Sequence, residues 1–157
     1  MPNVNNKKAL GIDYGLKRIG LSLSDDTQTI AFPLKYILND SAKKTVFELK
    51  TVIEEENIGL VVIGMPIGLK GKKTEISTEI EKFIEVLKES LKEKIGYGLI
   101  LTVYDERFSS AQAQRSLIEQ NIKRNKRKEK IDSIASTFIL QSYLDKQKNM
   151  IEKKISE

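Results

Sequence analysis

Three acidic positions, far apart along the chain, have side chains that could carry catalytic chemistry. Asp13 stands in the segment GIDYG at the end of an otherwise apolar strand candidate. Asp105 and Glu106 open the segment DER, and Asp132 follows a strongly basic stretch. Carboxylate oxygens select Mg²⁺ or Mn²⁺, and a pair of such ions can activate water and stabilise a leaving oxygen without histidine. These residue types suit metal-dependent hydrolysis of a phosphodiester.

Each acid also has a simpler structural interpretation. Asp13 would cap the turn at Gly15, which is the better interpretation of that motif alone. The acids of DER would be ordinary loop residues, and Asp132 would be a helix-start charge stabilised by the helix dipole. These separate interpretations leave the set unexplained, because the expected topology delivers all three positions to one edge of a sheet, beside the only cationic excess of the chain.

The composition narrows the chemistry further. The chain has 157 residues, the usual size of one domain, and contains neither cysteine nor histidine. Disulfides, thiolate zinc sites, cysteine nucleophiles and histidine-based acid-base schemes are therefore excluded. The N-terminal segment contains no apolar region of signal-peptide length, and no apolar run in the sequence is long enough to span a bilayer. We expect a cytoplasmic protein.

The positive charge is concentrated in one short stretch. The formal net charge is +5, and residues 123–130 (KRNKRKEK) hold six basic side chains and one glutamate, which equals the whole excess. A localised basic patch is typical of proteins that bind a polyanion, whose phosphates attract lysine and arginine. Taken alone, the stretch is equally consistent with a solvated basic loop.

Hydrophobic periodicity predicts a mixed α/β fold. Strict alternation or short apolar runs indicate strands, and apolar residues spaced three and four apart indicate helices. The predicted strands are 8–14, 18–24, 29–38, 60–63 and 99–104, and the predicted helices are 41–57, 76–91, 109–120 and 131–147. This order predicts an antiparallel meander joined to a parallel unit, with helices on both faces of the sheet. RNase H-like domains and the half-domains of actin-like ATPases share it.

Four segments of the chain resemble a known family. They are GIDYGLKRIGLSLSD (11–25), VVIGMPIGLKG (61–71), DERFSSAQA (105–113) and KIDSIASTFILQSYLD (130–145), and they resemble, in order and spacing, the signature blocks of the YqgF family, also called RuvX. The resemblance implies an RNase H-like fold, with a five-stranded mixed sheet in the order 3-2-1-4-5, related to Holliday junction resolvases. It also implies nuclease activity in maturation of the 5′ end of pre-16S rRNA.

The resemblance assigns roles to individual residues. Asp13, Glu106 and Asp132 match the catalytic and metal-ligating acids, with Asp105 as the neighbouring alternative, and the implied cofactor is Mg²⁺ or Mn²⁺ at a two-metal site. In the expected strand order, Asp13 and Glu106 stand about 10 Å apart, a gap that metals or substrate would have to bridge. The residues expected to contact nucleic acid are Lys17, Arg18, Arg107, Lys123, Arg124, Lys126, Arg127 and Lys128.

Other functions remain open from the sequence. An actin-like ATPase would need two RNase H-like domains, whereas we expect residues 1–157 to form a single domain with a flexible tail after about residue 148. A non-catalytic module that binds nucleic acid or ribosomes would keep the basic stretch without needing the three acids. Holliday junction cleavage would require a dimer that spans two symmetric strands, and the sequence reveals no dimer interface. RNA and branched DNA are both expected partners.

Overall fold

The protein is built on a mixed five-stranded sheet. The structure, a computed structural model, describes residues 7–66, 75–105 and 127–156, and of residues 127–132 and 156 only the backbone. The strands are β1 (Lys8–Asp13), β2 (Arg18–Ser24), β3 (Ala31–Leu38), β4 (Ile58–Met65) and β5 (Ile100–Asp105). Their order across the sheet is β3-β2-β1-β4-β5, as predicted. β2 pairs antiparallel with β1 and β3, whereas β4 pairs parallel with β1 and β5.

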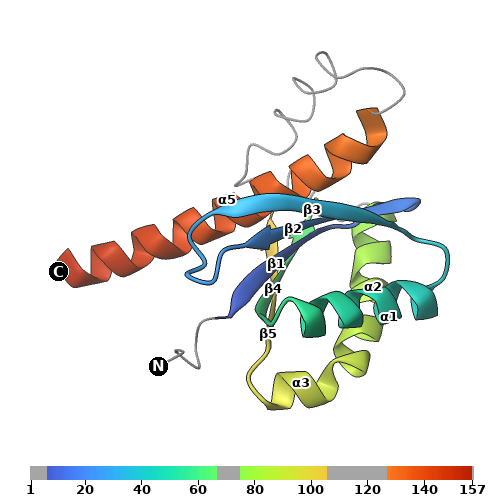
Figure 1. The fold of residues 1–157 in the computed structure, drawn as a ribbon, viewed down its shortest axis with the longest axis horizontal. Helices are drawn as coiled ribbons and strands as arrows, with labels where there is room; N and C mark the ends of the chain where they lie inside the picture. The colour runs from blue at the N-terminus through green and yellow to red at the C-terminus, as the bar shows by residue number, and fades with distance from the viewer. Residues whose placement is uncertain (1–6, 67–74, 106–126, 157) are drawn as a thin grey trace.

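Helices cover both faces of this sheet. On one face lie α1 (Ala42–Glu55) and α2 (Glu75–Ser90), and the short α3 (Lys92–Gly96) follows α2. The long helix α5 (Arg127–Ser156) crosses the other face and extends beyond the sheet toward the C-terminus (Figure 1). The expectation of helices on both faces is confirmed. In the described part of the chain, no helix has the length and the apolar character needed to cross a membrane.

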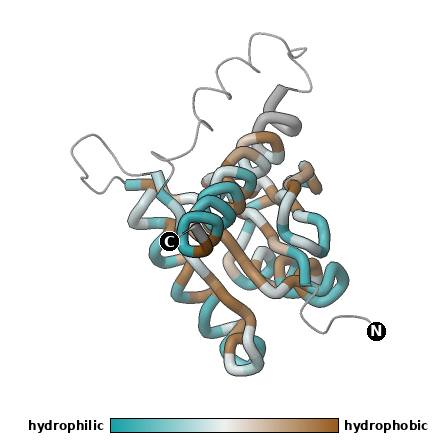
Figure 2. Tube along the Cα trace, turned by 90° about the vertical axis from the view of Figure 1, so that its left-hand side faces the viewer, coloured by the Kyte–Doolittle hydropathy of each residue, from teal (hydrophilic) through white to brown (hydrophobic). Residues whose placement is uncertain are grey.

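Strand alternation divides the core into two layers. Leu10 and Ile12 of β1 are buried in a cluster with the apolar faces of α1 and α2. Ala9, on the opposite face of the same strand, belongs to a second cluster with Ile139 and Leu140 of α5. Figure 2 shows hydrophobic residues along the strands between the helices. Successive residues of each central strand therefore face different helices, which decides which side chains can meet.

The helices on the first face form for reasons visible in the sequence. Ser41 caps α1 by accepting a hydrogen bond from the Lys44 amide at 3.3 Å. In α2, residues three and four apart make one buried stripe, and charged residues occupy the opposite side. The buried apolar residues of α2 are Ile80, Phe83, Ile84 and Leu87. The periodicity of residues 76–91 thus predicted this helix to within one residue at each end.

The predicted elements differ from the observed ones at the final helix and at α3. The final helix begins at Arg127 rather than Ile131 and continues to Ser156 rather than ending near Gln147. Residues 127–130 of the expected basic loop are thus helical, because lysine, arginine and glutamate favour helices and no glycine or proline interrupts them. The short helix α3 was not predicted, since five residues carry no readable periodicity. The helix predicted at 109–120 lies outside the described residues.

Candidate active site

Asp13 ends β1 at the carboxyl edge of the parallel strands. Its side chain is 7% exposed. It shares the face of β1 that carries Ala9 and Gly11, and an added Cβ on Gly11 would lie 2.9 Å from the Cβ of Leu140 in α5. Asp13 therefore faces the α5 side of the sheet. A carboxylate at the carboxyl edge of the parallel strands offers oxygen ligands that suit a site for divalent cations.

The turn after Asp13 is held in one conformation by close packing. An added Cβ at Gly15 would lie 2.3 Å from the carbonyl oxygen of Arg18, so the turn requires glycine. The Asn39 side-chain amide donates a hydrogen bond to the Gly15 carbonyl at 2.9 Å. The rings of Tyr14 and Phe83 pack with their centroids 4.9 Å apart. These contacts fix the backbone that carries Asp13.

Asp105 lies at the same edge of the sheet but on the other face. It pairs in register with Met65 of β4, the strand between β5 and β1, so two strand spacings of about 10 Å in total separate it from Asp13. Tyr104 packs in the α5 cluster and Leu101 against the cluster on the α1–α2 face. Asp105 is four residues after Leu101 on the same strand, so its side chain points to the same face of the sheet as Leu101. Asp13 and Asp105 thus lie at the same edge of the sheet, as expected. Their side chains, however, point to opposite faces of it.

Helix α5 is anchored to the sheet close to Asp13. The Ser22 hydroxyl lies 2.9 Å from both the carbonyl oxygen and the hydroxyl of Ser136, and both serines are fully buried. Further along the helix, the Gln141 side chain accepts a hydrogen bond from the Ala31 amide at 2.8 Å. Ala31 pairs with Ser24 of β2. From residue 141 back to 136, the helix thus passes from the level of Ser24 to the level of Ser22.

Asp132 occupies a position in α5 one turn before Ser136. The sequence predicted it in the first turn of the helix, but α5 begins at Arg127, so Asp132 lies in the second turn. The stabilising effect of the helix dipole falls off within the first turn. The interpretation of Asp132 as a helix-start charge is weaker as a result.

Two of the basic residues expected at nucleic acid lie in the described loop and strand after Asp13. Lys17 is exposed in the turn, and the Arg18 guanidinium stands 5.8 Å from the centroid of the Tyr36 ring. Asp13 pairs with Gly20, and Gly20 pairs with Tyr36, so these residues form one row across three strands on the α5 face. Sequence reasoning missed Tyr36, because only the strand register reveals this row.

The remaining predicted site residues cannot be placed in the same way. Glu106, Arg107, Lys123, Arg124 and Lys126 lie outside the described residues. Arg127 and Lys128 form part of the first turn of α5, for which the backbone alone is described. The described residues contain no group of three acids that could hold a metal ion. The predicted metal site includes Glu106 and Asp132, whose side chains are outside the described part of the structure.

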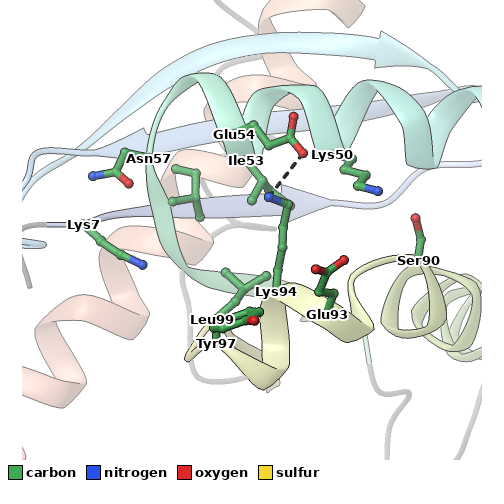
Figure 3. A pocket seen from close by; sticks show the side chains of 11 residues that line it. Lys7, Lys50, Ile53, Glu54, Asn57, Ser90, Glu93, Lys94, Tyr97 and Leu99 are labelled. Carbon is green, nitrogen blue, oxygen red and sulfur yellow. Dashed lines mark ion pairs between the residues drawn. The ribbon is translucent and has the colours of Figure 1, made fainter.

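A hollow lies away from these acids. It has a volume of about 470 Å³ and is lined by residues such as Lys7, Asn57 and Leu99, which stand at the start of β1, β4 and β5 (Figure 3). An ion pair of 3.2 Å between Lys94 and Glu54 crosses it. This hollow opens at the amino edge of the parallel strands, opposite to Asp13. In such folds, ligands bind beyond the carboxyl ends, so the hollow is not the candidate site.

Curated relatives cover most of this chain. A protein from Thermoanaerobacter pseudethanolicus is 38% identical over 143 residues, which are 90% of this chain and 99% of the relative. A protein from Sulfurihydrogenibium sp. is 42% identical over 139 residues, which are 88% of this chain and 90% of the relative. Both carry the name "Putative pre-16S rRNA nuclease".

Solved structures confirm the RNase H-like fold. The RuvC protein of T. thermophilus, in complex with Holliday junction substrate, matches with a TM-score of 0.56 and 15% identity, covering 90% of this chain and 95% of that one. The Fowlpox virus resolvase with Holliday junction DNA matches with a TM-score of 0.54 and 16% identity, covering 89% and 98%. A sequence model of the RuvX family, described as Holliday junction resolvase, matches residues 7–146. The chain belongs to the RuvX family.

Proposed function

We propose that this protein is a nuclease that hydrolyses phosphodiester bonds during maturation of the 5′ end of pre-16S rRNA. The observation that carries the proposal is the similarity, at 38% and 42% identity over about nine tenths of the chain, to relatives named as pre-16S rRNA nucleases. Such similarity across nearly the whole length supports a shared activity. We place the protein in the cytoplasm, with residues 1–157 acting as one domain.

The catalytic acids of this proposal are Asp13, Glu106 and Asp132. Strand alternation speaks against Asp105, because Tyr104 packs in the α5 cluster and Asp105, the next residue, faces the α1–α2 side, away from Asp13. The side chain of Asp105 thus points to the opposite face of the sheet from Asp13. Asp13 already faces α5, so Glu106 is the better partner for it across β4.

The path of α5 supports Asp132 as the third acid. Ser136 contacts Ser22, which pairs with Gly11. Four residues back along the helix is about 6 Å, and two residues along β1, from Gly11 to Asp13, is about 6.6 Å. Both displacements run in the same direction, because α5 passes from the level of Ser24 to that of Ser22 as its numbering falls. Position 132 is therefore expected at the level of Asp13.

A set of three carboxylates fits Mg²⁺ or Mn²⁺, which prefer oxygen ligands. A bound pair of ions would supply an activated water and stabilise the leaving oxygen. Asp13, Glu106 and Asp132 would hold the ions, and the buried position of Asp13 would keep its carboxylate from moving. The lack of histidine and cysteine in the chain agrees with this chemistry.

The basic residues around this edge would bind the phosphates of the substrate. Lys17 and Arg18 follow Asp13 after a short turn, and Arg18 shares the α5 face because it lies two residues before Gly20 on β2. The Tyr36 ring, next to the guanidinium of Arg18, could stack on an unpaired base. The other proposed contacts are Arg107, Lys123, Arg124, Lys126, Arg127 and Lys128.

Cleavage of Holliday junctions is the second candidate function. The family description names a Holliday junction resolvase, and the matching solved structures include two resolvases bound to junction DNA. The same carboxylates and metals would cut either substrate, because the chemistry of the phosphodiester is shared. The two functions differ in the substrate that the basic surface recognises.

One assay separates the two candidates. Purified protein with Mn²⁺ or Mg²⁺ is incubated with pre-16S rRNA leader fragments, unrelated single-stranded RNA and four-way DNA junctions, with Asp13→Asn as the control for contaminating nucleases. We expect metal-dependent cleavage of the leader that Asp13→Asn abolishes. Cleavage of junctions alone would favour the resolvase. Absence of cleavage on every substrate with both metals would contradict the nuclease proposal.

A further inference from the structure

An apolar groove with charged walls lies between α1 and α2. It has a volume of about 810 Å³. Phe47 of α1 is 71% exposed and Val86 of α2 is 44% exposed, and both line the groove. Both helices lie on the face of the sheet opposite to α5 (Figure 1), so the groove between them is on the face opposite to that of Asp13. Phe47 contributes almost no buried area to the hydrophobic core, so its exposure suits a surface that a partner covers.

The two walls of this groove carry opposite charges. Lys43 and Lys50 line it from α1, and Glu85 and Glu89 line it from α2. None of these four side chains forms an ion pair with another residue in the part of the chain that the structure describes. The groove therefore presents a positive wall, an apolar floor and a negative wall, with a net charge of zero.

We propose that a second copy of this chain docks on this groove and forms a two-fold symmetric dimer. A two-fold axis that runs along the groove exchanges its walls, so α1 of one copy faces α2 of the other. Each lysine wall then meets a glutamate wall, and Phe47 of each copy packs toward Val86 of its partner. An axis across the groove would set lysine against lysine, so the charges select the first arrangement.

The charge pattern of the groove favours a second copy of the chain over other binding partners. A nucleic acid or an anionic membrane would meet the repulsion of Glu85 and Glu89 along one whole wall. A second copy satisfies both walls at once through a single symmetry operation. The dimer leaves the α5 face of each copy open, so the proposed catalytic residues stay accessible in both. The inference goes beyond the nuclease proposal and does not depend on it.

Sedimentation of complementary charge variants tests the dimer. The variants are Lys43→Glu with Lys50→Glu, and Glu85→Lys with Glu89→Lys. Each alone places like charges across the interface and is expected to sediment as a monomer, whereas wild type shows a concentration-dependent dimer. Mixed in equal amounts, the two variants present opposite walls to each other and should form a heterodimer. Because the mixture regains the dimer, misfolding of either variant cannot imitate the result.

A matched pair of aspartate variants tests the apolar floor. Phe47→Asp should weaken the dimer by at least about 100-fold in dissociation constant, since the symmetric interface loses two buried aromatic contacts. Tyr97→Asp is the control, because Tyr97 is 83% exposed and does not line the groove. A second control, Lys44→Glu with Lys92→Glu, changes the net charge equally without touching the groove. Both controls should remain dimers.

Three results would overturn the proposal. Wild type could remain a monomer at the highest concentration, the two wall variants could fail to associate when mixed, or Phe47→Asp could dimerise as tightly as Tyr97→Asp. None of these readouts involves nuclease activity. Failure of the dimer and failure of the nuclease assignment are thus distinguishable.

Discussion

Ser22 on β2 and Ser136 on α5 bring their hydroxyl oxygens within 2.9 Å of each other, although 114 positions separate them in the sequence. Both side chains are fully buried, and the Ser22 hydroxyl also lies 2.9 Å from the Ser136 carbonyl oxygen. This contact sits directly beside Gly11, two residues before Asp13. It fixes the height of α5 on the sheet, and the position of Asp132 relative to Asp13 depends on that height.

The first prediction tests this anchor through Gly11. A methyl group at Gly11 would lie 2.2 Å from the Ser22 hydroxyl oxygen and 2.9 Å from the Leu140 Cβ. Gly11→Ala should therefore push α5 away, lower the free energy of unfolding by about 1–3 kcal/mol and reduce cleavage. Urea unfolding and the nuclease assay measure the two effects. Gly96→Ala is the control, because nothing lies within 4 Å of its added Cβ. Equal stability of both variants would contradict the anchor.

The order of the elements could be predicted because the hydrophobic periods differ clearly between strands and helices. Residues 76–91 show the helical period and became α2, and the two alternating segments on either side of Gly15 became β1 and β2. The helices on both faces of the sheet were predicted from the order of the elements, and the strand order through the family resemblance. These features depend on patterns of many residues, so no single side chain decides them.

The faces of the acids could not be predicted in the same way. Whether Asp105 or Glu106 meets Asp13 depends on strand parity, and a shift of one residue in the register exchanges the two faces. The start of α5 was missed because its first turn, residues 127–130, is all polar and precedes Ile131, the first apolar residue of the helix. The row from Asp13 through Gly20 to Tyr36 arises from pairing between distant strands. Sequence alone contains no local signal for it.

A second prediction uses strand parity to choose between neighbouring acids. Glu106→Gln should abolish metal-dependent cleavage, because it removes a ligand charge of the proposed metal site. Asp105→Asn should retain most activity, because Asp105 has the alternation of the α1–α2 face. Single-turnover cleavage with Mn²⁺ measures both. The opposite pattern, with Asp105→Asn inactive and Glu106→Gln active, would give the role to Asp105.

A third prediction concerns the basic segment before and at the start of α5. Replacing Lys126, Arg127 and Lys128 with alanine should weaken RNA binding and flatten its dependence on salt by about 2 in slope, since each phosphate contact to a single strand contributes about 0.7. Alanine favours helix, so α5 should still begin normally. Binding titrations at several salt concentrations measure the slope. If affinity and slope stay unchanged, the segment does not contact the substrate.

A fourth prediction follows from the turn between β2 and β3. Burial raises the pKa of Asp25, but hydrogen bonds from the Ile30 amide, the Thr27 hydroxyl and the Thr29 amide outweigh it and hold the pKa at about 2. The folded pKa is below the unfolded value, so this stabilisation is present above about pH 4 and disappears as the pH falls toward 2.

Urea unfolding of wild type and Asp25→Asn between pH 3 and 7 measures this effect. The variant should be less stable by about 1 kcal/mol near neutral pH, a value reduced for the partial exposure of the turn. The difference between the two proteins should shrink toward pH 3. Asp26→Asn is the control, because Asp26 is exposed in the same turn. A difference that does not change with pH would show that the Asp25 charge is not responsible.

The last prediction separates the two interpretations of Asp132. As a partner of the helix dipole, Asp132→Asn would lower stability by about 0.3–1 kcal/mol and leave cleavage intact. As one of a cluster of like charges, Asp132 is held at an electrostatic cost without metal, so the asparagine variant should be equally stable or more stable. We expect the second result, because Asp132 lies beyond the first turn of α5.

Thermal unfolding with and without millimolar Mn²⁺, alongside a nuclease assay on the same samples, makes this comparison. Wild type should gain stability with Mn²⁺, because the metal binds the folded protein, and Asp132→Asn should lose both that gain and the cleavage. Asp145→Asn is the matched control, since Asp145 is an exposed acid on the same helix more than three turns away. A variant at Asp132 that is less stable than wild type, responds equally to Mn²⁺ and still cuts RNA would exclude Asp132 from the metal site. The site would then have to be completed by another acid near Asp13.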